Sequence, residues 1–151
     1  MLFIQIYLFV ITQFKNIFAE QGDMAIILRG MEKITSTTCI RFEQYNPAKH
    51  RNYVQVEPQN AGMGCQAIVG RTPLARNGYQ FLRLAYEEGC VNEGTVAHEF
   101  IHSIGFWHEQ QRPDRDDWIT IEFQNIPQGE KCSTAAMPFC HQIMCYRQMS
   151  Q

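Results

Sequence analysis

The fold of this chain is decided by one stretch, His98-Glu99-Phe100-Ile101-His102-Ser103-Ile104-Gly105-Phe106-Trp107-His108-Glu109, which has the pattern H-E-x-x-H-x-x-G-x-x-H-E. On a helix, His98 and His102 are four residues apart, so their rings lie one above the other on the same face. Gly105 can adopt the left-handed conformation that ends a helix. The chain can then turn back and bring His108 toward the same point from another direction.

This spacing predicts a catalytic zinc site with one ion per chain. Three imidazoles leave the fourth position of a tetrahedral zinc open, and an open position distinguishes catalytic from structural zinc. Two histidines and a glutamate on a helix face can also be ordinary surface chemistry, but here the glycine and the third histidine follow at the required offsets. We therefore predict that His98, His102 and His108 bind zinc, and that Glu99 is the general base acting on a metal-bound water.

The flanking residues predict that this stretch begins on a helix. Asn92 can serve as the N-cap, and Val91 and Val96 are placed to form a hydrophobic staple across it. Glu93 suits the positive end of the helix dipole. An apolar stripe that would bury the helix against a sheet is formed by Val96, Phe100, Ile101 and Ile104.

Composition indicates one globular domain and a protein that resides in an oxidising compartment. A chain of 151 residues with 45% apolar residues can build one substantial core. A net charge of −2 gives no support for a nucleic acid or an anionic membrane as partner. The six cysteines form no C-x-x-C pair, so disulfides are favoured over a zinc ribbon.

Residues 1–20 have two interpretations. The apolar run over residues 2–11 is too short to span a bilayer, and with Lys15 and Ala19 behind it the run favours a signal peptide and secretion. No Lys or Arg precedes the run, however, and Gln5 interrupts it. The alternative is a buried first strand over residues 6–13.

Residues 21–151 are predicted to form a single α+β domain. Asp23 can cap a helix that ends near residues 36–38 and carries on one face Met24, Ile27, Leu28, Met31 and Ile34. Alternating or β-branched runs predict strands over residues 39–42, 53–56, 67–70 and 79–85. The helix that carries the histidines follows.

The chain resembles the astacins, the metzincin family that includes the meprins and tolloid-type proteases. The resemblance is carried by residues 94–118, in which Glu109 follows the third histidine and R-x-D-R-D occupies residues 112–116. Upstream, Gly30-Met31 and residues 38–42 are similar to the family's first helix and the cysteine strand after it. The likeness extends over about residues 24–126.

The resemblance implies a twisted mixed sheet with two main helices, zinc on the second helix, and an irregular C-terminal subdomain that is shortened here. It implies a zinc metalloendopeptidase that acts on proteins or peptides and is exported. The strand over residues 81–85 matches the family's edge strand, to which an extended peptide can add through backbone hydrogen bonds. The alternative is an ordinary edge strand.

Further residues acquire roles only through the resemblance. Cys65 and Cys90 match a family disulfide, whereas the partner of Cys39 is left open among Cys132, Cys140 and Cys145. Met144 resembles the Met-turn methionine, with Tyr146 as a zinc ligand at rest that assists the transition state; the alternative is a divergent tail. Glu109 matches a glutamate that contacts the freed amino terminus of the mature enzyme; the alternative is a solvated surface carboxylate.

Two functions remain in competition. The first is a secreted zinc endopeptidase of the astacin type, truncated because only 43 residues follow His108. The second is a catalytically impaired zinc-binding remnant that acts as a binding module. The intact Glu99 favours the first function, and the short tail, which would weaken the grip on substrate, favours the second.

Overall fold

The structure is a computed structural model that describes residues 8–14, 21–60, 62–71, 78–85 and 89–126. The chain divides into two compact units, Met1–Phe106 and Trp107–Gln151, and each is described by itself. No helix within the described ranges is long and apolar enough to cross a membrane.

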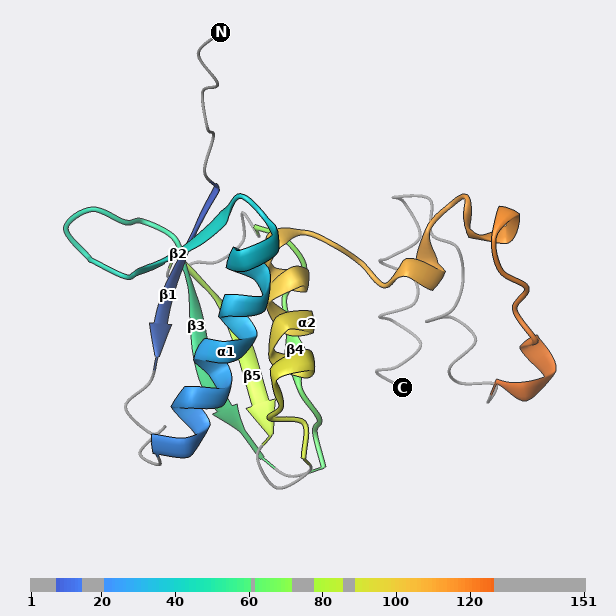
Figure 1. Cartoon of the computed structure of the whole chain (residues 1–151), viewed down its shortest axis with the longest axis horizontal. Helices are drawn as coiled ribbons and strands as arrows, with labels where there is room; N and C mark the ends of the chain where they lie inside the picture. The colour runs from blue at the N-terminus through green and yellow to red at the C-terminus, as the bar shows by residue number, and fades with distance from the viewer. Residues whose placement is uncertain (1–7, 15–20, 61, 72–77, 86–88, 127–151) are drawn as a thin grey trace, which may run out of the picture. The chain divides into compact units, whose positions relative to one another are not determined.

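The first unit is built on a five-stranded mixed sheet (Figure 1). Its strands are β1 (Leu8–Phe14), β2 (Ile40–Gln44), β3 (Tyr53–Gln59), β4 (Gln66–Ala67) and β5 (Tyr79–Ala85). The spatial order is β2-β1-β3-β5-β4, and β4 alone pairs antiparallel with its neighbour. This α+β architecture with a mixed sheet confirms the predicted fold class.

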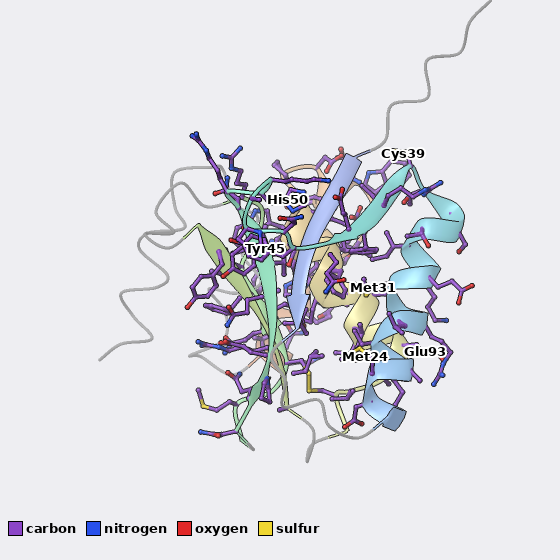
Figure 2. The ribbon with its side chains drawn as sticks, turned by 90° about the vertical axis from the view of Figure 1, so that its left-hand side faces the viewer. Met24, Met31, Cys39, Tyr45, His50 and Glu93 are labelled. Carbon is purple, nitrogen blue, oxygen red and sulfur yellow. A yellow bond between two sulfur atoms is a disulfide. The ribbon has the colours of Figure 1, made fainter. Side chains whose placement is uncertain are left out.

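Two helices, α1 (Gln21–Thr37) and α2 (Glu93–Ile104), pack against one face of the sheet. Met24 and Met31 point from α1 toward the strands in Figure 2. The apolar core between helices and sheet contains Ile27, Met31, Ile34, Ile40, Val54, Val56, Leu82, Leu84, Val96, Ala97 and Phe100. The ring of Phe100 lies edge-to-face on that of Phe42 with centroids 4.9 Å apart, which anchors α2 over β2.

The two helices are in close contact at Gly30. A β-carbon built there would lie 2.6 Å from Cγ1 and 2.8 Å from Cβ of Val96. Beside this contact, Arg29 Nε donates to Glu93 Oε1 at 2.6 Å, and this hydrogen bond, with help from Lys33, lowers the pKa of the exposed Glu93 carboxyl. A glycine is therefore needed in the middle of α1 for packing, despite its poor helix propensity.

We expect Gly30→Ala to destabilise the fold, although the same change in an isolated helix would stabilise it by about 1 kcal/mol. The added methyl group has to displace the β-branched Val96, and overpacking of this kind costs about 1–3 kcal/mol. Thermal unfolding of Gly30→Ala, Val96→Ala and the double variant measures the effect. The double variant should recover part of the loss. Additive effects of the two single changes would contradict the close contact.

The structure confirms most predicted elements and corrects two predicted faces. The helix predicted from Asp23 is α1, and the strand predicted over residues 79–85 is β5. However, Leu28 is 51% exposed and Ile101 is 41% exposed, so neither belongs to the core. Both residues lie at the margin of their apolar stripe, where solvent rather than the sheet faces the helix.

The prediction that residues 81–85 form a sheet edge is wrong. β5 lies between β3 and β4, and its Leu82 and Arg83 pair with Ala67 and Gln66 of β4. Among the strands that the structure describes, the outermost on this side is therefore β4, which is shorter than the predicted strand over residues 67–70. β1 occupies the region for which the sequence allows a signal peptide or a strand.

In the second unit, the described residues form only short turns of 3₁₀ helix: η2 (Glu109–Gln111), η3 (Arg115–Asp117) and η4 (Phe123–Asn125). Arg115 is buried and donates from Nη1 to the carbonyl oxygen of Gln110 at 2.9 Å. Its guanidinium also pairs with Asp116 and lies 6.0 Å from the ring centre of Phe123. Arg115 of the R-x-D-R-D segment thus links η2, η3 and η4, the three short helical turns of the described part of this unit.

Candidate metal centre

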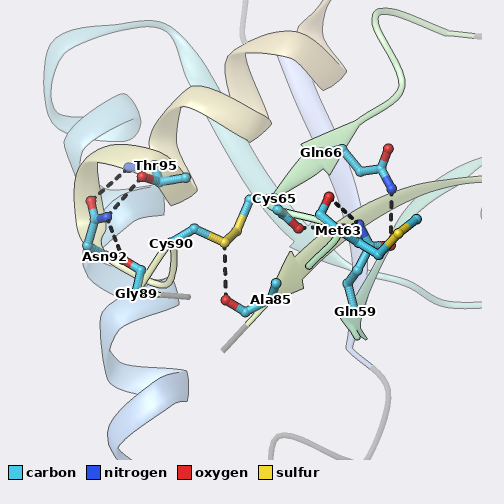
Figure 3. Close-up of a disulfide and its surroundings, with 10 residues drawn as sticks. Gln59, Met63, Cys65, Gln66, Ala85, Gly89, Cys90, Asn92 and Thr95 are labelled. Carbon is cyan, nitrogen blue, oxygen red and sulfur yellow. Dashed lines mark hydrogen bonds between the residues drawn. A yellow bond between two sulfur atoms is a disulfide. The ribbon is translucent and has the colours of Figure 1, made fainter. Parts of the chain in front are cut away.

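The ends of α2 are fixed by the residues that the sequence identified. The side chain of Asn92 accepts a hydrogen bond from the backbone N–H of Thr95 at 3.0 Å, which caps the start of the helix (Figure 3). Gly105 ends the helix in the left-handed region, with φ of 118°. A non-glycine residue would be strained there, so the glycine permits the chain to turn after the helix.

The predicted metal-binding atoms lie close together. One ring nitrogen from each of His98, His102 and His108 lies within 4.8 Å of the others. The rings of His98 and His102 are 4.4 Å apart between centroids and nearly perpendicular, as expected for helix positions four apart. Imidazole nitrogen is a preferred zinc ligand, so these three residues could hold one such ion.

The hydrogen bond of the buried His102 determines which of its ring nitrogens could bind a metal. Its Nδ1 lies 2.7 Å from the carbonyl oxygen of Phe106. Because a carbonyl can only accept, Nδ1 must carry the proton and donate, and the ring lone pair is then on Nε2. A backbone carbonyl that orients a histidine in this way is typical of metal sites.

Glu99 has the environment expected of a proton acceptor beside a metal-bound water. It is 5% exposed, and its Oε2 is buried without a hydrogen-bond partner among the described residues. Burial raises the pKa of the Glu99 carboxyl, and the nearby His102 opposes the shift. A buried carboxylate oxygen without a donor is costly. A water on a metal held by the three imidazoles would supply that donor, so these residues fit a zinc ion.

The disulfide implied by the resemblance is present. Cys65 and Cys90 are bonded with 6.1 Å between their α-carbons, and Figure 3 shows the bond joining the segment before β4 to the segment before α2. Closing a loop of this length contributes about 3 kcal/mol in the chain-entropy account. Cys39 is exposed and has no disulfide partner among the described residues. Its three candidate partners lie outside them.

The remaining predicted site residues fall into two groups. Glu109 is exposed, with 80% of its side chain accessible, and pairs with Nη1 of Arg112 at 2.6 Å. The same guanidinium pairs with Asp114 at 2.7 Å and lowers the pKa of that carboxyl. This geometry agrees with a solvated surface glutamate. Met144 and Tyr146 lie outside the described residues.

Two residues that sequence reasoning missed contact the last turn of α2. The backbone N–H of Gly70 donates to the carbonyl oxygen of His102 at 2.8 Å. The side-chain amide of Gln80 donates to the carbonyl oxygen of Ser103 at 3.3 Å. A glutamine on the buried face of a strand was the available signal, because a buried amide needs a partner.

A mixed sheet covered by two helices, with H-E-x-x-H and a third histidine on and after the second helix, defines the metzincin class of metallopeptidase folds. Residues 9–139 match the family model described as Astacin, which is a peptidase family. The chain belongs to the astacin family.

Known relatives agree with this assignment. The chain is 36% identical over 105 residues to zinc metalloproteinase nas-4 of Caenorhabditis elegans, covering 70% of this chain and 30% of the relative. It is 37% identical over 119 residues to blastula protease 10 of Paracentrotus lividus, covering 75% of this chain and 18% of the relative. The chain therefore spans less than a third of the length of these curated relatives.

Solved structures agree with the fold. High choriolytic enzyme 1, a hatching-enzyme zinc protease from Oryzias latipes, superposes with a TM-score of 0.73 at 26% identity, over 87% of this chain and 60% of that one. Myroilysin superposes with a TM-score of 0.52 at 13% identity, over 87% of this chain and 68% of that one, and supports the fold alone.

Proposed function

We propose that this chain is a zinc-dependent metalloendopeptidase domain in which His98, His102 and His108 bind one zinc ion and Glu99 is the general base. The observation that carries the proposal is the convergence of three imidazole nitrogens within 4.8 Å, in a chain of the astacin family. The buried, unsatisfied Oε2 of Glu99 supports the role of base. Proteins or peptides are the proposed substrates.

The described residues supply the proton chemistry of peptide hydrolysis. When bound, zinc lowers the pKa of its water to about 7 and polarises the scissile carbonyl. Glu99 accepts the proton of the attacking water at its carboxylate and then donates it to the departing amine. The Phe106 carbonyl keeps the proton of His102 on Nδ1 throughout. Burial of Glu99 keeps bulk water away from the proton-transfer step.

We propose that an extended substrate adds to β4 rather than to β5. β4 is the outermost strand on its side of the sheet, so one row of its backbone groups faces away from β5. Beyond β4, Gly70 is hydrogen-bonded to His102, which brings this edge to the end of α2 that carries a predicted ligand. Backbone pairing reads little sequence and therefore suits varied protein substrates.

Secretion is part of the proposal. The disulfide between Cys65 and Cys90 is of a kind that persists in oxidising compartments and is rare in the cytosol. We expect the disulfide to form when the chain is exported from a eukaryotic cell, and mass spectrometry with and without reduction would detect it. Two free thiols at these positions in exported protein would contradict this part of the proposal.

The proposed activity is tested by incubating the full, zinc-loaded chain with casein, with and without a metal chelator. We expect cleavage that the chelator abolishes and that added zinc restores. Cleavage that resists the chelator would contradict a zinc mechanism. If the chain binds zinc but cleaves nothing, the activity is contradicted and the alternative function, a zinc-binding remnant acting as a binding module, is supported.

A further inference from the structure

The last turn of α2 ends in a capping motif that satisfies two of its carbonyls and leaves that of Ser103 without a partner inside the helix. Carbonyl oxygens at a helix end have no partner within the helix. The N–H of Phe106 donates to the carbonyl of Ile101 at 3.2 Å, and the N–H of Gly105 donates to that of His102 at 2.8 Å. These are the two bonds of a Schellman motif. Neither of them reaches the carbonyl of Ser103.

The sheet supplies the missing donor. Gln80 is only 8% exposed and lies on β5, on the face that α2 covers. Its side-chain Nε2 donates to the carbonyl oxygen of Ser103 at 3.3 Å. From the segment that follows β4, the N–H of Gly70 adds a second bond to the carbonyl of His102. The last turn of α2 is therefore closed by its own cap and by two donors from outside the helix, one on β5 and one in the segment after β4.

Ser103, which accepts the hydrogen bond from Gln80, is next to the predicted ligand His102 and contacts the predicted base Glu99. Ser103 follows His102 in sequence, and its Oγ donates to the carbonyl oxygen of Glu99 at 3.2 Å. The Phe106 carbonyl that orients His102 lies just past the same turn. A shift of the Ser103 peptide would therefore change the contact that fixes the tautomer and direction of the His102 ring.

We infer that Gln80 is a positioning residue of the metal centre, which acts by holding the last turn of α2 through the Ser103 carbonyl. The inference rests on the proposed function, because it assumes that His102 binds the metal. Without the amide, a buried carbonyl lacks its donor, and the turn relaxes toward another partner. Loss of a residue that orients a metal ligand typically weakens metal binding about 10–100-fold. Because Gln80 acts through the backbone and does not contact the ligand itself, we expect a loss of zinc affinity at the low end of this range, about tenfold.

A matched control exists on the neighbouring strand. Gln55 on β3 is also buried, at 9% exposure, but its position pairs with Phe81 while that of Gln80 pairs with Val54, so the two glutamines point to opposite faces of the sheet. Its amide donates to Glu57 at 3.1 Å and not to the helix. Loss of the Gln55 amide therefore also removes a buried hydrogen bond donated by a glutamine, but one that ends on a strand carboxylate and not on α2.

The test compares Gln80→Met with Gln55→Met in the full chain. Zinc affinity is measured by competition with a chromophoric chelator, the visible spectrum is recorded at saturating Co²⁺, and melting temperature is followed for both. We expect Gln80→Met to weaken zinc binding about tenfold and to alter the cobalt spectrum. Gln55→Met should keep both within twofold of the unmodified chain, whatever its melting temperature.

Equal zinc affinities and unchanged cobalt spectra in the two variants would overturn the inference, because a merely structural role moves only the melting temperature. If the unmodified chain binds no zinc, the proposed function fails instead. Should Gln80→Met not fold, Gln80→Asn and Gln55→Asn give the same comparison, since asparagine keeps a polar amide but withdraws it by one methylene. The same criteria then apply.

Discussion

Glu99→Gln is expected to retain one zinc per chain and to lose proteolytic activity by at least about 10²–10⁴-fold. Glutamine has nearly the same shape as glutamate and is not a metal ligand here, so the three imidazoles keep their positions. An amide cannot accept the proton of the attacking water and return it to the leaving amine. The measurement is the initial rate of casein cleavage, with zinc content determined on the same samples.

The control for this prediction is Glu32→Gln, a matched substitution at an exposed residue of α1. It should leave both rate and zinc content unchanged. If Glu99→Gln cleaved casein at the unmodified rate, Glu99 would not be the base. If the variant lost its zinc, the distinction between base and ligands would be wrong.

Phe100→Ala is expected to lower the free energy of unfolding by about 3–5 kcal/mol. Phe100 is fully buried, and its ring packs edge-to-face on Phe42. Truncation leaves a cavity between α2 and β2 that the surrounding side chains can fill only partly. Denaturant unfolding should be measured in the presence of a chelator, because a bound metal would add its own stabilisation to both proteins.

Ile101→Ala provides the comparison on the same helix. Ile101 is the next residue and is 41% exposed, so its truncation should cost less than about 1 kcal/mol. Similar losses for the two variants would mean that α2 does not present Phe100 to the sheet in the orientation described. A loss confined to Phe100→Ala would support that orientation.

Local signals in the sequence were sufficient to predict the helix that carries His98 and His102. Asn92 caps its start and Gly105 ends it, and both effects depend on residues within a few positions along the chain. The spacing of His98 and His102 likewise determines which face of the helix they share. The family resemblance, rather than spacing, predicted the disulfide between Cys65 and Cys90.

Features that depend on distant parts of the chain were not predictable in this way. Leu28 and Ile101 fit the helical period, but only the placement of neighbouring elements decides whether the margin of a stripe is covered. Whether β4 or β5 lies at the edge depends on which strands pair. The residue pattern over 79–85 does not indicate whether that strand is internal or at the edge. The role of Gln80 could be inferred only from the structure, in which its amide on β5 contacts the last turn of α2.

The most direct measurement is the zinc content of the folded, dialysed chain beside those of His98→Ala and His50→Ala. We predict one zinc per chain in the unmodified protein and in His50→Ala, whose histidine pairs with Glu43 outside the motif. His98 is exposed, so its replacement should remove the zinc without unfolding the domain. Absence of stoichiometric zinc from the unmodified chain, or its full retention in His98→Ala, would contradict the proposed metal centre.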